Sequence, residues 1–406
     1  MRPHKRLLLR SLSLLLLLSL SPETIRACRY NVRDVGFVDL ETGAYHLYAF
    51  TRAETPAEIV SLLQQRPAAA LRDCNIQVEV VNGDAPTNHP AFQHLSRGPA
   101  DSLPTAVLVS PDGQALPLTL SRPGQSFQDS LASALGESAS SVKREEILRT
   151  VCQAFAAVLL IEGDGADENE RARRVISRAI DAIGTQMRSM PKAVAEPPAM
   201  IVLDAAVLLQ ERILLWSLGL EATRTALPRA VVLYGRARWI GPVMKGEEIS
   251  EPNLTGLLSI IGADCECGLD VAWTLGTRLP VRWEEARHAQ VAKALAFDPE
   301  SPLVKLEVSR IARRSTSPRA PSSSYQELGF SADRTPAAGD APLVDSLNVK
   351  SGSAGTPPGK RVGETVPLLG STSVLSRGLI SLVVLAAIAV SGGLFLFWRA
   401  GRGRPK

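Results

Sequence analysis

Two segments of the chain share one layout, in which Leu-Pro opens an apolar strand, a tight turn follows, and a second strand leads to a helix. The first runs from Leu103-Pro104 through Pro111-Asp112-Gly113, and the second begins at Leu227-Pro228. A turn of this kind between two apolar runs predicts a β-hairpin. Serine caps and glycine stops predict the following helices at 126–136 and 250–261. The repetition indicates a duplicated domain.

The residues before each hairpin also match. In the first half, strands are expected at 45–50 and 76–81 and helices at 55–73, capped by Thr55, and 92–95. The second half places strands at 157–161 and 200–203 and helices at 168–183 and 208–218. The predicted order is β-α-β-α-β-β-α, twice. A chain of 406 residues that is 45% hydrophobic can bury the cores of two such α/β domains.

This order, with a proline at the start of the third strand, resembles the thioredoxin fold over residues 31–262. The resemblance implies that Pro104 and Pro228 are cis prolines beside a groove, where an exposed strand edge could accept an extended peptide. Active thioredoxins carry Cys-x-x-Cys after the first strand, where the helix N-terminus lowers the thiol pKa. The matching segments here, 51–56 and 162–168, contain no cysteine. Dithiol exchange at that position is therefore excluded.

Both ends of the chain carry membrane signals. Residues 1–27 have the basic, leucine-rich and polar parts of a signal peptide, and the apolar part is too short to span a bilayer comfortably. Cleavage before Cys28, retention as an anchor and lipidation of Cys28 all stay open. Residues 378–398 hold no charge and are long enough for one transmembrane helix, and the basic tail 399–406 predicts a cytoplasmic C-terminus.

The domains predicted between these signals are 28–140 for the first thioredoxin-like domain and 141–300 for the second with a C-terminal extension. Residues 301–377, rich in Ser, Pro, Gly and Ala, are expected to form a disordered linker. The expected location is the cell membrane, single-pass, with the body outside the cytoplasm in the periplasm. The high ratio of Arg to Lys suits a GC-rich bacterial gene.

The charge distribution argues against a nucleic-acid partner. The net charge is +4, but residues 1–27 and 399–406 each contribute a net +4. The region between them therefore carries a net charge of −4. A mildly acidic body does not offer the basic surface that nucleic acids require.

Few residues suggest chemistry. Gly163 and Gly165 open a helix, but Glu162, Asp164 and Asp167 would repel a pyrophosphate, so we expect helix capping and no cofactor. Cys265 and Cys267 are the candidate redox or metal residues. They could instead pair with Cys28, Cys74 or Cys152, or stay free and buried. Two cysteines are too few for a closed metal site, and no catalytic set is recognisable.

The function predicted from the sequence is a membrane-anchored module that binds a protein or peptide through redox-inactive thioredoxin-like domains. The main alternative is a thiol-disulfide or metal-handling protein that uses Cys265 and Cys267. A third hypothesis is an accessory subunit of a membrane complex. The expected partners are the membrane and an unidentified protein.

Overall fold

The computed structural model describes residues 29–84, 89–95, 104–190, 192, 194–264 and 275–315. Outside the described residues lie the predicted signal peptide, Cys265 and Cys267, the predicted span 378–398 and the tail 399–406. Within the described ranges, no helix is both long enough and apolar enough to cross a membrane.

The first repeat forms a four-stranded sheet in the order β2-β1-β3-β4. Its strands are β1 Tyr45–Thr51, β2 Ile76–Asn82, β3 Thr105–Val109 and β4 Ala115–Leu118. β1 and β2 are parallel, whereas β3 runs antiparallel to both β1 and β4. A parallel pair needs a crossover helix and an antiparallel pair needs only a tight turn, so the pairing follows from the order of elements.

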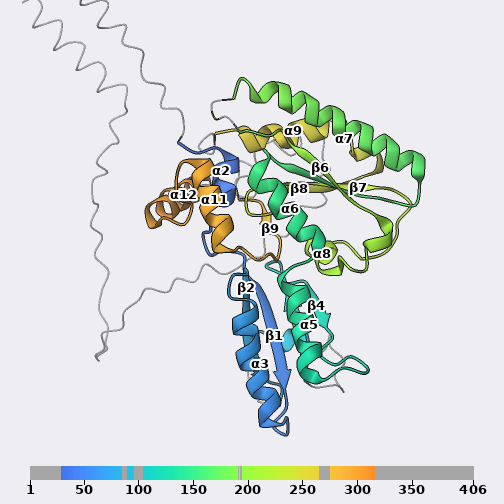
Figure 1. Cartoon of the computed structure of the whole chain (residues 1–406), viewed down its shortest axis with the longest axis vertical. Helices are drawn as coiled ribbons and strands as arrows, with labels where there is room; N and C mark the ends of the chain where they lie inside the picture. Colours follow the sequence, from blue (N-terminus) through green and yellow to red (C-terminus); the bar gives the residue numbers. More distant parts are fainter. Residues whose placement is uncertain are drawn as a thin grey trace, which may run out of the picture. The chain divides into compact units, whose positions relative to one another are not determined.

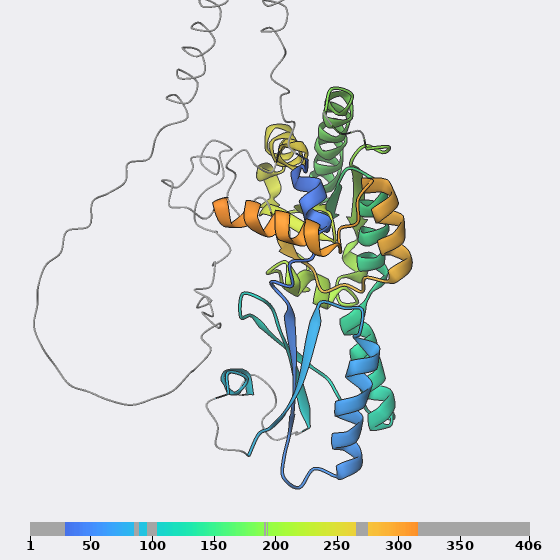
Figure 2. The same ribbon diagram turned by 90° about the vertical axis from the view of Figure 1, so that its left-hand side faces the viewer.

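Helices cover both faces of this sheet. α3 (Ala57–Ala70) and α5 (Phe127–Ala139) pack on one face, and the short α4 (Phe92–Leu95) lies on the other (Figure 2).

Ser126 caps α5 as predicted, because its side chain accepts a hydrogen bond from the Asp129 N–H. The predicted glycine stop at Gly136 is wrong. α5 continues to Ala139 because Ser138 and Ala139 are themselves buried.

The second repeat forms a five-stranded sheet in the order β6-β5-β7-β8-β9 (Figure 1). Its strands are β5 Ala157–Ile161, β6 Ala199–Leu203, β7 Arg229–Tyr234, β8 Arg238–Lys245 and β9 Thr277–Arg278. The first four strands repeat the parallel and antiparallel pattern of the first sheet. β5 and β7 are buried at every residue, as expected for strands covered on both faces.

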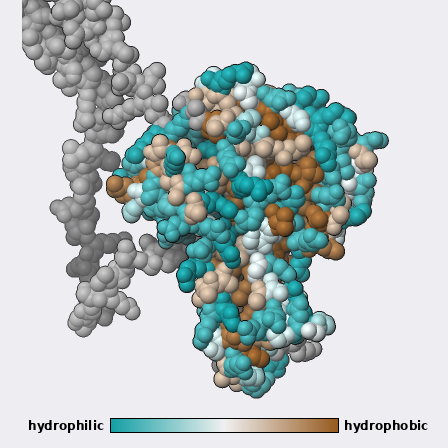
Figure 3. All heavy atoms as spheres, in the orientation of Figure 1, coloured by the Kyte–Doolittle hydropathy of each residue, from teal (hydrophilic) through white to brown (hydrophobic). Residues whose placement is uncertain are grey.

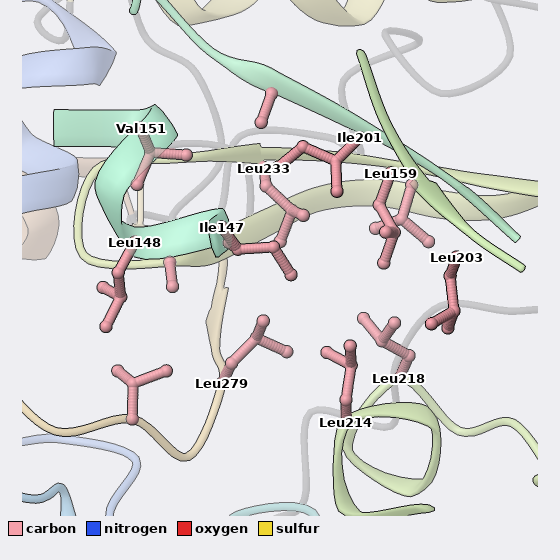
Figure 4. Close-up of a cluster of buried hydrophobic side chains, with 14 of the residues drawn as sticks. Ile147, Leu148, Val151, Leu159, Ile201, Leu203, Leu214, Leu218, Leu233 and Leu279 are labelled. Carbon is pink, nitrogen blue, oxygen red and sulfur yellow. The ribbon is translucent and has the colours of Figure 1, made fainter. Parts of the chain in front are cut away.

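One face of the second sheet is covered by α7 (Ala166–Met187) and α9 (Glu251–Gly262). α6 (Val142–Gln153) and α8 (Arg212–Ser217) cover the opposite face. Figure 4 shows the apolar layer on that side, where Leu148, Leu214 and Leu233 come from α6, α8 and β7. Short 3₁₀ turns occur at Ala205–Val207 and Gly246–Glu248. The strand order and pairing of both sheets confirm a thioredoxin-like fold for each repeat.

The predicted boundary of the first domain at residue 28 is wrong. α2 (Val32–Phe37) packs on the second domain, where Val32 N–H donates to the Ala263 carbonyl at 3.0 Å. The Arg236 N–H donates to Gly36 at the same distance. A Cβ on Gly36 would lie 2.5 Å from the Tyr234 ring, so this close approach needs a glycine. The N-terminal segment therefore belongs structurally to the second domain.

The predicted linker also starts too early. Residues 302–315 form α12 (Pro302–Ser315), which follows α11 (Glu285–Leu295). Val304, Val308 and Ile311 of α12 pack with Tyr30 and other apolar residues of the N-terminal segment. These side chains recur at a helical spacing, and their burial offsets the entropic cost of ordering this segment.

The segment after β9 joins the two domains. The Asn75 side chain of the first domain donates to the Leu279 carbonyl and accepts from the Val281 N–H, both at 3.0 Å. Trp283 N–H donates to the Asp73 carbonyl at 2.6 Å. Since β9 pairs with β8, this segment is hydrogen-bonded to both domains. The C-terminal extension thus fixes one domain to the other.

Candidate functional site

The two prolines lie where the thioredoxin resemblance places them in the chain. Pro104 directly precedes β3 and Pro228 directly precedes β7. However, β3 lies between β1 and β4, and β7 lies between β5 and β8. The exposed strand edge predicted beside each proline is therefore wrong, because the hairpin partner and the first strand occupy both edges.

In the second domain, the main chain of the loop after β5 lies against the backbone that precedes Pro228. Asp164 N–H donates to the Thr225 carbonyl at 2.9 Å. A Cβ added to Gly163 would meet the Leu227 carbonyl carbon at 2.7 Å and the Ala226 oxygen at 2.8 Å. The side chain of Asn169 closes the same turn with two 2.9 Å hydrogen bonds to the main chain of Gly163. The backbone just before Pro228 is thus already engaged by the loop that holds the thiols in active thioredoxins.

The carboxylates around this loop are held by arginines. Glu162 accepts from Arg173 at 2.6 Å, and Glu168 accepts from Arg171 at 2.9 Å. Both pairs link a carboxylate at or just before the start of α7 to an arginine further along the helix. Negative charge at the start of a helix is favoured by the helix dipole. The predicted side-chain capping is wrong, because α7 has no side-chain cap bond, but Asp167 and Glu168 do lie in its first turn. Gly165 at the N-cap has no side chain to contribute.

Gly163→Ala should destabilise the second domain by about 1–3 kcal/mol, because the new methyl group would push on the main chain of residues 225–227. Gly165→Ala is the matched control, since its Cβ would lie 3.5 Å from the nearest atom. Urea unfolding of both variants measures the difference. Equal stability of the two variants would contradict the close packing of these loops.

The matching loop of the first domain is closed by polar side chains. The Thr55 hydroxyl accepts from the Arg52 N–H at 2.8 Å, and Asp84 accepts from the Ala53 N–H at 2.8 Å. Thr55 was expected to cap the following helix, but α3 has Pro56 at its N-cap and no side-chain cap. Thr55 instead closes the loop that precedes the helix. No thiol stands at this helix start, residues 51–56.

The described cysteines are poorly suited to redox chemistry. Cys74 and Cys152 form no disulfide with each other. Burial raises the pKa of Cys152 to about 11 and also raises the pKa of Cys74, so both thiols stay protonated near neutral pH. Within the described residues no group of His, Cys, Asp and Glu could hold a metal ion. The candidates Cys265 and Cys267 lie outside this part of the chain.

A cavity of about 570 Å³ opens where the two domains meet, and we call it the junction groove. Its lining comes from the loop after β4, the α5–α6 connection and the start of α8: Thr119, Arg122, Glu137, Ser140, Ser141, Val142, Arg144 and Leu209 to Leu214. Only Ser140 and Ser141 separate α5 from α6. The groove therefore forms at the shortest covalent connection between the domains.

Buried polar groups build the floor of the junction groove. Glu211 accepts from the Ser141 hydroxyl at 2.5 Å and from the Lys143 N–H at 2.9 Å. Arg144, almost fully buried, donates to the Pro280 carbonyl at 2.6 Å and the Ser138 carbonyl at 2.8 Å. The bond to Ser138 joins α6 to the first domain, and the bond from Ser141 joins the connection between the domains to Glu211. The groove thus has a floor whose polar groups are held in place by these bonds.

Apolar side chains line the rim. Val142 is 82% exposed and Leu209 is 79% exposed, which is unusual for large aliphatic residues. Both also line the groove. Figure 3 shows hydrophobic residues gathered on the face of the molecule that carries α6 and α8. Below the rim, Ile213 enters the core of the first domain, and the Trp216 and Tyr45 rings lie 5.8 Å apart.

No pattern in the sequence predicted the junction groove. Arg144 stands one helical turn before Ile147 and Leu148, on the stripe that continues to Val151, and all of these residues are buried. An arginine on an apolar stripe signals a buried, paired charge. The pairing itself depends on residues as distant as Pro280, which no local pattern could identify.

No protein-family profile matches the chain, and no curated protein is similar in sequence. Among solved structures, it is similar to the first two thioredoxin domains of Saccharomyces cerevisiae Eps1p, with 12% identity and a TM-score of 0.19 over 51% of this chain and 86% of that one. Human ERp44 in its zinc-bound form has 11% identity and a TM-score of 0.20 over 54% and 56%. The Naumovozyma dairenensis Eps1p domains have 9% identity and a TM-score of 0.17 over 55% and 92%. These likenesses are too low to carry weight. The strand order of the two sheets gives each repeat a thioredoxin-like fold.

Proposed function

We propose that the chain is a membrane-anchored, extracytoplasmic binding module in which two thioredoxin-like domains act as a scaffold and do not exchange disulfides. The observation that carries this proposal is the closure of both helix starts. At Thr51–Pro56 and Glu162–Glu168 there is no thiol, and hydrogen bonds within the chain occupy the loops. A thioredoxin-like domain without thiols at this position can still bind a partner through its surface.

The contact surface in this proposal is the junction groove. Its size falls within the usual range of ligand sites, and an aliphatic rim over a polar floor fits a protruding protein segment with one apolar side chain. The prolines are a weaker choice because the strands that they open have neighbours on both sides. The occupant is a protein partner, since the exposed rim offers apolar contact outside the cavity.

Anchoring is part of the proposal. The uncharged run 378–398 and the basic residues after it would hold the C-terminus in the membrane with the tail inside, and a cleaved signal at 1–27 would export the body. Residues 316–377 would then separate the body from the bilayer and let the junction groove reach a partner.

Photo-crosslinking in native membranes tests the proposed contact. Benzoylphenylalanine placed at Val142 or Leu209 should give a discrete adduct with one partner, because both side chains border the junction groove. The control position is Glu170 on α7, which is also exposed but lies outside the groove lining. The same adduct at all three positions would overturn the groove as the contact surface.

The redox alternative predicts a different result. A partner held only through a mixed disulfide, released by reductant and lost in Cys265→Ser with Cys267→Ser, would favour thiol exchange. An adduct at position 209 that survives reductant and persists in the double variant would favour a binding module.

A further inference from the structure

The charged groups that line the junction groove do not balance. The described residues of its lining include three arginines and two glutamates: Arg122, Arg144, Arg212, Glu137 and Glu211. Arg122 donates to Glu137 at 2.6 Å, so these two charges compensate each other. The charges of Arg144 and Glu211 also interact, and both side chains are buried in the floor. Arg212 is the positive charge that remains.

Arg212 stands exposed in the wall of the groove, at the first residue of α8. Within the described part of the chain it forms no ion pair, and its side chain makes one hydrogen bond, of 3.4 Å, to the Pro117 carbonyl. A long bond to a neutral acceptor locates the guanidinium but does not compensate its charge. Because a guanidinium carries five N–H donors, most of them stay available to a ligand.

The exposed aliphatic rim lies beside this charge. Leu209 precedes Arg212 by three residues in the turn that leads into α8, and Leu209, Val142 and Arg212 all line the same cavity. A segment that covers Leu209 therefore comes within reach of the guanidinium. Arginine and carboxylate form paired, charge-assisted hydrogen bonds, and these are strengthened where neighbouring apolar groups exclude water.

We propose that the junction groove binds a partner segment that carries an aliphatic side chain beside an Asp or Glu, with the carboxylate accepting from Arg212. This inference rests on the function proposed above and adds the chemistry of the partner. A basic segment is a poorer fit, because Glu137 and Glu211 are already engaged by groups of the chain itself. Arg212 is thus the residue that selects the partner by charge.

Charge variants of Arg212 test this proposal in the full chain in native membranes, with benzoylphenylalanine at position 209. Arg212→Glu should lower the yield of the partner adduct at least about tenfold, because attraction becomes repulsion. Arg212→Lys should retain more adduct than Arg212→Gln. The matched control is Arg149→Glu, at an exposed arginine of α6 outside the groove lining, which should stay within about twofold of the parent.

Two further measurements separate charge recognition from a change in fold. Added salt should lower the adduct yield of the parent chain more than that of Arg212→Gln, since salt screens only the charged contact. Mass spectrometry of the adduct identifies the cross-linked partner segment, which should contain an Asp or Glu. Replacing that acid with Arg should remove the adduct with the parent chain and restore it with Arg212→Glu.

The outcomes that would overturn this inference are distinct from failure of the proposed function. An adduct whose yield is unchanged in Arg212→Glu, or whose partner segment holds no acid, would show a purely apolar contact and leave the binding module standing. Covalent dimers or lipid adducts at position 209 would identify a second copy or a bilayer as the occupant. No adduct even in the parent chain would contradict the groove as the contact surface, and this inference with it.

Discussion

Replacing Arg144 with Met should lower the free energy of unfolding by about 3–5 kcal/mol. The guanidinium of Arg144 donates to the carbonyls of Glu137, Ser138 and Pro280 and to the Ser141 hydroxyl. Methionine would fill much of the space but leave these buried acceptors without a donor. It would also leave the buried Glu211 without its nearby positive charge.

The matched control for this prediction is Arg149→Met, because Arg149 lies on the same helix but is exposed. Its effect should stay within about 0.5 kcal/mol. Urea unfolding followed by circular dichroism measures both variants, and we expect two separated transitions for Arg144→Met because the domains lose a shared contact. A loss no larger than that of Arg149→Met would show that Arg144 does not hold the junction.

Asp39→Asn should lower stability by about 2–4 kcal/mol near neutral pH. Asp39 accepts from Arg278 at 2.7 Å and lies 3.4 Å from Arg236, and both arginine side chains are buried. Burial alone would raise the pKa of Asp39, but the two arginines outweigh it and lower the pKa to about 2. A neutral amide would leave the charge of Arg278 uncompensated inside the protein.

The same change predicts a pH dependence with a definite sign. Because the folded pKa of Asp39 lies below its ordinary value, the stabilisation from its charge is complete above about pH 4 and is lost as the pH falls toward 2. The difference in unfolding free energy between wild type and Asp39→Asn should therefore shrink over that range. Asp181→Asn, at an exposed carboxyl on α7, is the control for the loss of a surface charge. A difference that stays constant with pH would contradict the role of this ion pair.

Local signals in the sequence determined the elements and their order. The turn at Pro111-Asp112-Gly113 predicts the β3–β4 hairpin, and Ser126 and Ser250 cap α5 and α9 through hydrogen bonds to residues three positions on. Each signal acts within a few residues, so it survives in any tertiary context that keeps the backbone near it. The missing cysteines at 51–56 and 162–168 are likewise a property of the sequence alone.

Only the tertiary structure decided which surfaces close and which stay open. The approach of Gly36 to Tyr234, the contact of Gly163 with residues 225–227 and the bond from Arg144 to Pro280 join residues that are far apart in the chain. Such contacts depend on how helices and sheets pack, and a single sequence carries no local trace of them beyond an unexplained glycine or arginine. The loop before Pro228 is engaged by Asp164 and lies against Gly163, and the junction groove emerged only once the domains were packed together.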